Sequence, residues 1–173
     1  MKNVIYLFLL LCCSVSFCQN QKLRTTALNT KELENNTYIG FDGLGNNYYF
    51  NNNVFSKQNE NQIWEYKNVA LGKITSVDYV NPLKIVLFYG DFNSIIILDN
   101  QLNEIQKLNL FDIDYTIFAS KIGMASQNKL WIYNALKQQI MLFDYLKNTS
   151  KIIGNPIQEN INYTQSDFNN FYW

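Results

Sequence analysis

Histidine is absent from the 173 residues of this chain. Histidine is the most common general base near neutral pH and the most common zinc ligand, so its absence removes the usual basis of many catalytic and metal sites. The charge is balanced, with 14 basic and 14 acidic residues. A nucleic-acid-binding protein, or one held electrostatically at a membrane surface, usually has a basic excess. The composition therefore argues against a nucleic-acid partner, and no motif indicates a cofactor or a metal.

Cysteine is confined to the start of the chain, where Cys12, Cys13 and Cys18 lie. Residues 1–18 combine the basic Lys2, an apolar run of about ten residues and a short stretch of small residues, as a secretory signal peptide does. The apolar run is shorter than the roughly 20 residues that a membrane-spanning helix requires. We predict cleavage after Cys18, which leaves an exported chain with neither cysteine nor a transmembrane segment.

A lipid-modified Cys18 is the alternative interpretation of this segment. A lipoprotein signal usually has a small residue directly before the cysteine, whereas Phe17 occupies that position here. The sequence therefore favours export to the periplasm, the cell surface or the medium without lipid anchoring through Cys18.

The remaining chain divides into two parts by composition. Residues 19–36 are polar and lack apolar periodicity, so we expect a leader without a core of its own. The chain as a whole is 47% hydrophobic and 16% aromatic, which suits a packed domain. We assign that domain to residues 37–173.

A repeat with an offset of 45 residues organises this domain. Residues 84–99 read KIVLFYGDFNSIIILD, and residues 129–144 read KLWIYNALKQQIMLFD. Each begins with lysine and an apolar run and, after a polar break, ends with a second apolar run and aspartate. Repeats of roughly 40–50 residues built from short strands are typical of β-propeller blades.

Short β-branched or aromatic runs between turn residues predict strands, and continuous apolar runs such as residues 95–98 predict strands buried on both faces. Four such strands make one blade. The expected strands are residues 37–41, 48–50, 54–57 and 62–67 in the first blade, 73–79, 84–89, 94–98 and 104–110 in the second, and 119–125, 129–133, 139–143 and 150–153 in the third.

The C-terminal segment repeats the start of a blade. Residues 164–170 read TQSDFNN and residues 75–81 read TSVDYVN, with Thr, Asp, an aromatic residue and Asn in common. The offset of 89 residues is close to two repeats. We therefore expect the first strand of another blade here, with the second strand beginning at Phe171.

With these repeats, the chain resembles secreted bacterial β-propeller proteins, especially uncharacterised ones with blades of the NPLKI type. The likeness covers about residues 37–173 and implies an all-β fold of propeller-like blades with four antiparallel strands, about three of them present. It implies no set of functional residues. The residues that carry it are 74–78, 81–88, 95–103 and 130–144.

Three blades are too few for a closed propeller, which requires about four to eight. An open array exposes sheet faces and edge strands, which allow self-association. Three explanations stay open: a truncated gene product, a ring assembled with another copy, and a smaller β-sandwich or open sheet.

Two pairs of aspartates are candidates for chemistry. Asp99 and Asp144 recur at matching positions and could hold a cation, but this recurrence favours a structural role as turn caps. Asp112 and Asp114 could form an acid–base pair or a metal clasp, and both would lie on one side of an extended stretch. This pair has no histidine, arginine or third carboxylate beside it, so we assign no catalytic, cofactor-binding or metal-binding residue.

Asp42 lies in a cluster of Asp, Gly and Asn residues between two aromatic runs. A calcium loop requires several carboxylates at alternating positions, and Asp42 is the only charged residue of the cluster. The cluster therefore predicts a hairpin turn.

Large side chains also have two interpretations. Trp64, Trp131 and Trp173 could stack on sugar rings. We expect the first two in the core and leave the third open. Lys84 and Lys129 open matching strands, and we expect solvated charges at the strand edges.

The sequence favours a non-catalytic, exported β-repeat protein that acts as a binding or interaction scaffold for a protein or a glycan. The second hypothesis is a carbohydrate-active or other hydrolytic enzyme on a propeller, with Asp112 and Asp114 as its carboxylates. The third is a fragment of a longer propeller without a function of its own.

Overall fold

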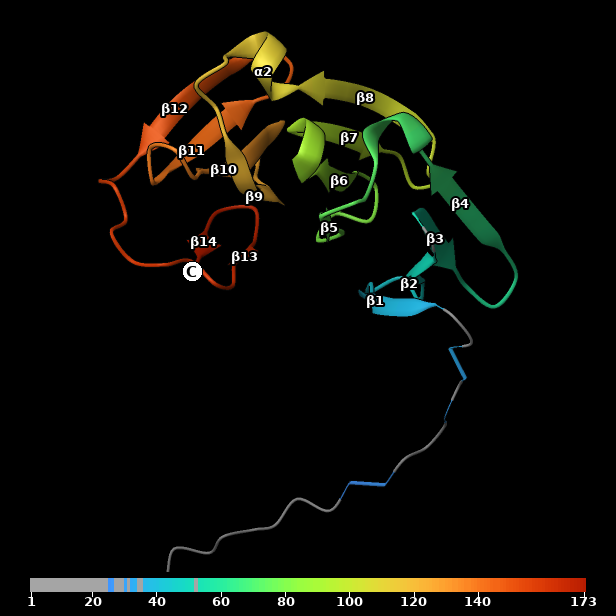
Figure 1. The fold of residues 1–173 in the computed structure, drawn as a ribbon. Coiled ribbons are helices and arrows are strands. Elements are labelled where there is room, and N and C mark those ends of the chain that lie inside the picture. The colour runs from blue at the N-terminus through green and yellow to red at the C-terminus, as the bar shows by residue number, and fades with distance from the viewer. Residues whose placement is uncertain (1–24, 27–29, 31, 34–35, 52) are drawn as a thin grey trace, which may run out of the picture. The chain divides into compact units, whose positions relative to one another are not determined.

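The computed structural model describes residues 25–26, 30, 32–33, 36–51 and 53–173. The predicted signal peptide and most of the polar leader lie outside these residues. The chain forms two units, Met1–Glu32 and Leu33–Trp173, and every strand among the described residues belongs to the second (Figure 1).

The second unit contains four antiparallel sheets in its described part, each with its strands in sequence order. Sheet A consists of β1 (Thr37–Phe41), β2 (Asn47–Asn51), β3 (Val54–Gln58) and β4 (Ile63–Lys67). Sheet B consists of β5 (Ser76–Asp78), β6 (Ile85–Tyr89), β7 (Ser94–Leu98) and β8 (Glu104–Asn109). Sheet C consists of β9 (Ala119–Met124), β10 (Lys129–Asn134), β11 (Gln139–Asp144) and β12 (Thr149–Ile153). Sheet D consists of β13 (Gln165–Ser166) and β14 (Phe171–Tyr172).

These sheets confirm the predicted all-β class and the three blade-like units of four antiparallel strands. Short helical turns connect some strands, namely η1 (Val69–Leu71), η2 (Gly90–Phe92) and α2 (Leu110–Ile113). The largest difference from the predicted bounds in the three four-stranded sheets is in β5, which is shorter at both ends, and β8 ends one residue earlier than predicted. That strand ends at Asn109 because the Asn109 side chain accepts a hydrogen bond from Phe111 N at 2.9 Å and caps α2.

Sheet B is buried on both faces, as the continuous apolar runs predicted. Ile95 and Ile97 belong to a core that sheet B shares with sheet C, and Ile96 and Leu98 belong to a core shared with sheet A. All four side chains are at most 1% exposed. Alternate residues of one strand thus fill two different cores, which explains why the sequence shows no polar alternation.

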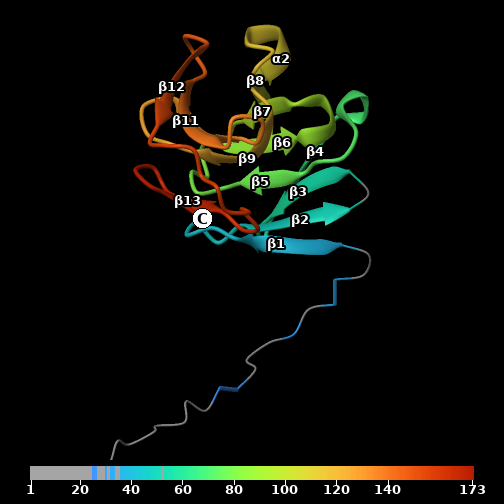
Figure 2. The ribbon, with the colours of Figure 1, turned by 60° about the vertical axis from the view of Figure 1, so that its left-hand side comes forward.

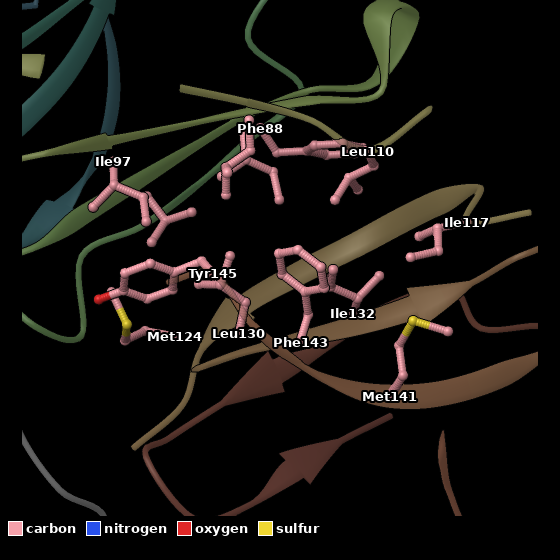
Figure 3. Packing of buried hydrophobic residues seen from close by; sticks show 13 residues of the cluster. Phe88, Ile97, Leu110, Ile117, Met124, Leu130, Ile132, Met141, Phe143 and Tyr145 are labelled. Carbon is pink, nitrogen blue, oxygen red and sulfur yellow. The ribbon is translucent and has the colours of Figure 1, made fainter. Parts of the chain in front are cut away.

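The core between sheets B and C combines side chains from β6, β7 and α2 with side chains from β10 and β11. Figure 3 shows Phe88 and Leu110 on one side of this core and Ile132 and Phe143 on the other. Complete burial of such a side chain contributes roughly 1.5–3 kcal/mol. All three cysteines lie within residues 12–18, so no disulfide joins the sheets and their stability depends on packing of this kind.

The two outer sheet faces of the array differ in polarity. Sheet A turns Phe55 and Trp64 toward sheet B, and strand alternation places Ser56 and Glu65 on the opposite face. Sheet C turns apolar side chains away from sheet B, among them Trp131, which pack against the segment after β12. The outward face of sheet A also carries the exposed Phe41 and Ile63 and is therefore mixed in character, whereas the face of sheet C is suited to further packing.

Candidate functional site

The first strands of sheets B, C and D line a common cavity of about 400 Å³. β9 packs against both β5 and β13, and Figure 2 shows the three strands close together. The polar lining includes Asp78, Lys121 and Gln165, and the aromatic lining includes Tyr79 and Tyr163. The cavity therefore brings together side chains from three consecutive repeats.

Asp78 is the central residue of this site. Its Oδ1 accepts a hydrogen bond from Val80 N at 3.0 Å, and its Oδ2 accepts from Met124 N at 2.9 Å and from Ser166 Oγ at 3.3 Å. The carboxylate thus joins the first strands of three sheets. Removal from water raises the pKa of Asp78, and the three hydrogen bonds oppose this shift only in part.

Gly123 makes the contact between Asp78 and Ser166 possible. A Cβ atom at position 123 would overlap with Ser166 Oγ and would lie 2.9 Å from Ser166 Cβ and 3.1 Å from Asp78 Oδ2. Gly40 in β1 has the same role toward sheet B, because a Cβ atom there would overlap with the hydroxyl of Tyr79. In both places a glycine in a first strand leaves room for a side chain of a following sheet.

The cavity offers several kinds of contact to a ligand. Asp78 supplies a hydrogen-bond acceptor, Lys121 supplies donors, and the amide of Gln165 supplies both. Tyr163 is 72% exposed and can present its ring face. One carboxylate and one ammonium group leave these side chains without net charge, so the lining suits a polar, uncharged molecule.

The recurring aspartates have the structural role that the repeat predicted. Asp99 Oδ1 accepts hydrogen bonds from Gln101 N at 2.8 Å and Asn103 N at 2.9 Å. Asp144 Oδ1 accepts from Leu146 N and from the next backbone N–H, each at 3.1 Å. Both carboxylates therefore cap the turns that follow β7 and β11.

Asp42 organises the β1–β2 turn in the same way, which confirms the predicted hairpin. Its Oδ1 accepts from Leu44 N at 2.8 Å and Asn46 N at 3.0 Å, and its Oδ2 accepts from the buried Tyr48 hydroxyl at 2.7 Å. Burial alone would raise the pKa of Asp42, but these hydrogen bonds lower it below its ordinary value.

Asp112 and Asp114 do not lie in an extended stretch, so the condition under which both side chains would face the same side is not met. Asp112 is in α2 and Asp114 is its C-cap, and residues two apart in a helical turn point in different directions. Asp114 Oδ1 accepts from Thr116 N at 2.8 Å, and this hydrogen bond lowers the pKa of Asp114. Within the described residues, no three Asp, Glu, Cys or His side chains gather as a metal site would require.

The tryptophans occupy different environments. Trp64 packs into the core between sheets A and B, with Lys57 Nζ 5.0 Å from its ring centroid, and Trp131 is 7% exposed, so both lie where they were predicted. Trp131 Nε1 donates a hydrogen bond to the Asp167 carbonyl at 3.1 Å. Trp173 is 60% exposed and lines a second cavity of about 490 Å³ beside Trp131.

Lys84 joins two sheets, so the prediction of a solvated edge charge is wrong for this residue. Its Nζ donates hydrogen bonds to Asn128 Oδ1 at 2.9 Å and to the Tyr145 hydroxyl at 3.1 Å. Asn128 directly precedes β10 and Tyr145 directly follows β11, so both partners belong to the sheet C side. The equivalent Lys129 donates to Gln127 Oε1 at 3.0 Å, two residues earlier in the same chain segment.

Sequence reasoning missed the site at Asp78, although the repeat contains a signal for it. The match between residues 75–81 and 164–170 makes Asp78 and Asp167 equivalent, and the offset of 45 residues makes Gly123 equivalent to both. The glycine at this position of β9 marks the place where the side chain of Asp78 can reach sheet D, although Asp167 itself follows β13 and the contact is made by Ser166.

No protein-family model matches this chain, and no match was found among curated proteins. Among the described residues, no helix has the length and apolar character needed to cross a membrane.

Proposed function

We propose that this chain is an exported, non-catalytic β-propeller-like protein that binds its ligand in the cavity between β5, β9 and β13. The observation that carries this proposal is the convergence of three first strands on one cavity with polar and aromatic side chains. In propellers the blades surround a central channel. Export is supported by the signal-like pattern of residues 1–18.

The chemistry of the lining favours a hydroxyl-rich ligand, such as the terminal sugar of a glycan. Sugar hydroxyls both donate and accept hydrogen bonds, which matches Asp78, Lys121 and Gln165. The ring of Tyr163 offers an apolar face for the C–H groups of a sugar. The cavity volume of about 400 Å³ lies within the range of roughly 300–1,000 Å³ that ligand pockets occupy.

Calorimetric titration of the purified chain with monosaccharides and oligosaccharides tests this function, with candidates taken from a glycan array. We expect Lys121→Ala and Tyr163→Ala each to weaken binding by about tenfold. Two matched variants serve as controls, because they remove the same side-chain types elsewhere. Lys151→Ala lies on the outer strand β12 of the same sheet, and Tyr115→Ala removes a ring that is 80% exposed.

Absence of saturable binding to any saccharide would contradict the proposal. So would equal losses in the cavity variants and in their controls, because the effect would then not depend on the cavity.

A further inference from the structure

A smaller cavity of about 230 Å³ lies at the boundary between sheets B and C, away from the lining of the proposed sugar site. Its walls come from the turn after β5, the β9–β10 turn and the residue after β11. The polar residues that line it are Asn81, Lys84, Ser126, Gln127, Asn128 and Tyr145. The cavity is several times larger than the roughly 30 Å³ that one water molecule occupies, so it has room for a small polyatomic ion.

The amide oxygens of this lining are already engaged within the chain. Asn81 Oδ1 accepts a hydrogen bond from Leu83 N at 3.1 Å, and Gln127 Oε1 accepts from Lys129 Nζ at 3.0 Å. A backbone N–H group and an ammonium group can only donate, so each partner identifies the oxygen of the amide that it meets. The NH2 groups of Asn81 and Gln127 are therefore the parts of these side chains that are left for a ligand.

Asn128 is held in the same way by two donors. Its Oδ1 accepts from Lys84 Nζ at 2.9 Å and from the Tyr145 hydroxyl at 3.0 Å. The same hydroxyl accepts from Lys84 Nζ at 3.1 Å. These contacts use two of the three protons of the Lys84 ammonium group and leave one, together with the NH2 group of Asn128.

The remaining capacity of the cavity is thus mostly that of a hydrogen-bond donor. Three amide NH2 groups and one ammonium proton can only donate, and the hydroxyl of Ser126 can donate as well. Among the described residues that line the cavity, none carries a carboxylate. A positive charge surrounded by donors favours an anion, because hydrogen bonds to an ionised acceptor are the stronger ones.

The aspartates that come closest to these residues along the chain are occupied by other donors. Asp78 accepts the three hydrogen bonds described above, and Asp144 caps the turn after β11. Asp167 Oδ1 accepts from Asn169 N and Asn170 N at 2.7 Å each. These carboxylates therefore do not take the donors of the cavity.

We propose that this cavity binds a sulfate or phosphate group, with Lys84 as its charged ligand and with Ser126, Gln127 and Asn128 as hydrogen-bond donors. A tetrahedral oxyanion has more acceptor oxygens than a carboxylate and can meet donors from several directions at once. The donors belong to two sheets, since Lys84 begins the approach to β6 and the other three lie between β9 and β10. The bound anion would therefore also join sheet B to sheet C.

NMR titration of the purified chain with sodium sulfate and with sodium phosphate tests the proposal. Sodium chloride at the same ionic strength is the control for general screening of charges. We expect saturable shifts of the amide signals of residues 83–84 and 126–128 with either oxyanion. Chloride should give only small shifts that do not saturate.

A charge variant with a matched control places the site. Gln127→Glu puts a carboxylate into the lining, where it can still accept from Lys129, and should weaken sulfate binding at least about tenfold. Gln138→Glu adds the same charge in the β10–β11 turn of the same sheet and should leave sulfate binding unchanged. The two glutamines are both exposed and have similar backbones, with φ of 56° and 54°.

A second variant keeps the contact between the sheets while it removes the free charge. Asn128→Asp retains an acceptor for Lys84 and Tyr145, so we expect the chain to fold. The new carboxylate neutralises the ammonium group, and sulfate binding should again fall at least about tenfold. Thermal unfolding of each variant without the anion checks that the fold is retained.

Comparison of inorganic phosphate with glucose 6-phosphate identifies the source of the group. Tighter binding of the sugar phosphate supports an anion carried by a larger molecule, and equal affinities support the free ion. Lys121→Ala, which tests the sugar site, should leave sulfate binding unchanged, so the two proposals can fail separately.

Two results would overturn the anion site. One is a titration in which sulfate and phosphate shift the signals of residues 126–128 no more than chloride does. The other is an equal loss of sulfate binding in Gln127→Glu and Gln138→Glu, because the effect would then come from net charge and not from the cavity.

Discussion

Asp78 shows how one carboxylate can make stability depend on pH. Its pKa in the folded chain is raised, chiefly by removal from water. The ionised form is therefore less favourable in the folded state than in the unfolded state, so stability is greatest below the ordinary pKa and falls as the pH rises through the folded pKa.

Asp78→Asn removes this titration. We compare the free energy of unfolding of the wild-type chain with that of the Asn variant. The wild-type value minus the variant value should be higher at pH 3 than at pH 7, and any difference between the proteins that does not depend on pH leaves this change unaffected. Urea unfolding of both proteins at the two pH values checks this. A relative stability that increases toward pH 7 would show that the hydrogen bonds from Met124 and Ser166 outweigh burial.

Asp42 changes the stability of the fold with pH in the opposite direction. Its lowered pKa contributes stability that is present above the ordinary pKa and is lost as the pH falls through the folded pKa. Tyr48→Phe removes the buried hydroxyl that donates to Asp42 Oδ2, and we expect a loss of about 1–2 kcal/mol at pH 7 and a smaller loss in acid. Denaturant unfolding at both pH values measures the loss in the free energy of unfolding. Tyr38→Phe is the control, because that side chain is 43% exposed.

Gly123 is expected to tolerate no side chain. Gly123→Ala forces Ser166 away from Asp78 and should cost about 1–3 kcal/mol, with faster amide exchange in sheet D. Gly43→Ala is a matched control, since no atom lies within 4 Å of a Cβ atom there. Equal stability of the two variants would mean that sheet D can shift without loss.

At the scale of the elements, the repeat predicted most strands because each core strand needs a short apolar run between turn residues. The sequence could not place the end of β8 correctly, since Leu110 is compatible with a strand until the Asn109 side chain caps the helical turn that begins there. The helical turn that this hydrogen bond caps also contains Asp112 and ends at Asp114, so it sets the directions in which the two side chains point. Lys84 was misjudged because its partners, Asn128 and Tyr145, lie more than 40 residues away in the chain.

The candidate site was the least predictable part for a similar reason. The offset of 45 residues identifies Asp78 and Gly123 as equivalent, but equivalence does not show which side chains face each other across two sheets. That information depends on how sheets B, C and D pack together.

The core between sheets B and C should depend strongly on β11. Phe143 is fully buried, and Phe143→Ala removes a large side chain from a core that cannot close completely around the gap. We expect a loss of about 3–5 kcal/mol in the free energy of unfolding, as calorimetry or urea titration would measure it. Phe41→Ala, at a position that is 70% exposed, should change it far less. Similar losses in both variants would contradict this assignment of the core.

At the scale of the whole second unit, the sheets should differ in local stability. Sheet B is covered on both faces, sheet C has a cavity on one face, and sheet D has two short strands. We expect amide hydrogen exchange to be slowest in β6 and β7 and fastest in β13 and β14, because exposed hydrogen bonds open locally at low cost. Uniform exchange would mean that the unit opens only as a whole.

The hydrogen bond between Ser166 and Asp78 joins residues 88 positions apart, whereas sheets A, B and C each form from strands that follow one another directly. Contacts between neighbouring strands form early in folding, and a contact across so long a loop forms late. During synthesis the ribosome releases β5 long before β13. The cavity therefore becomes complete only at the last stage of folding, and ligand binding would report that this stage has been reached.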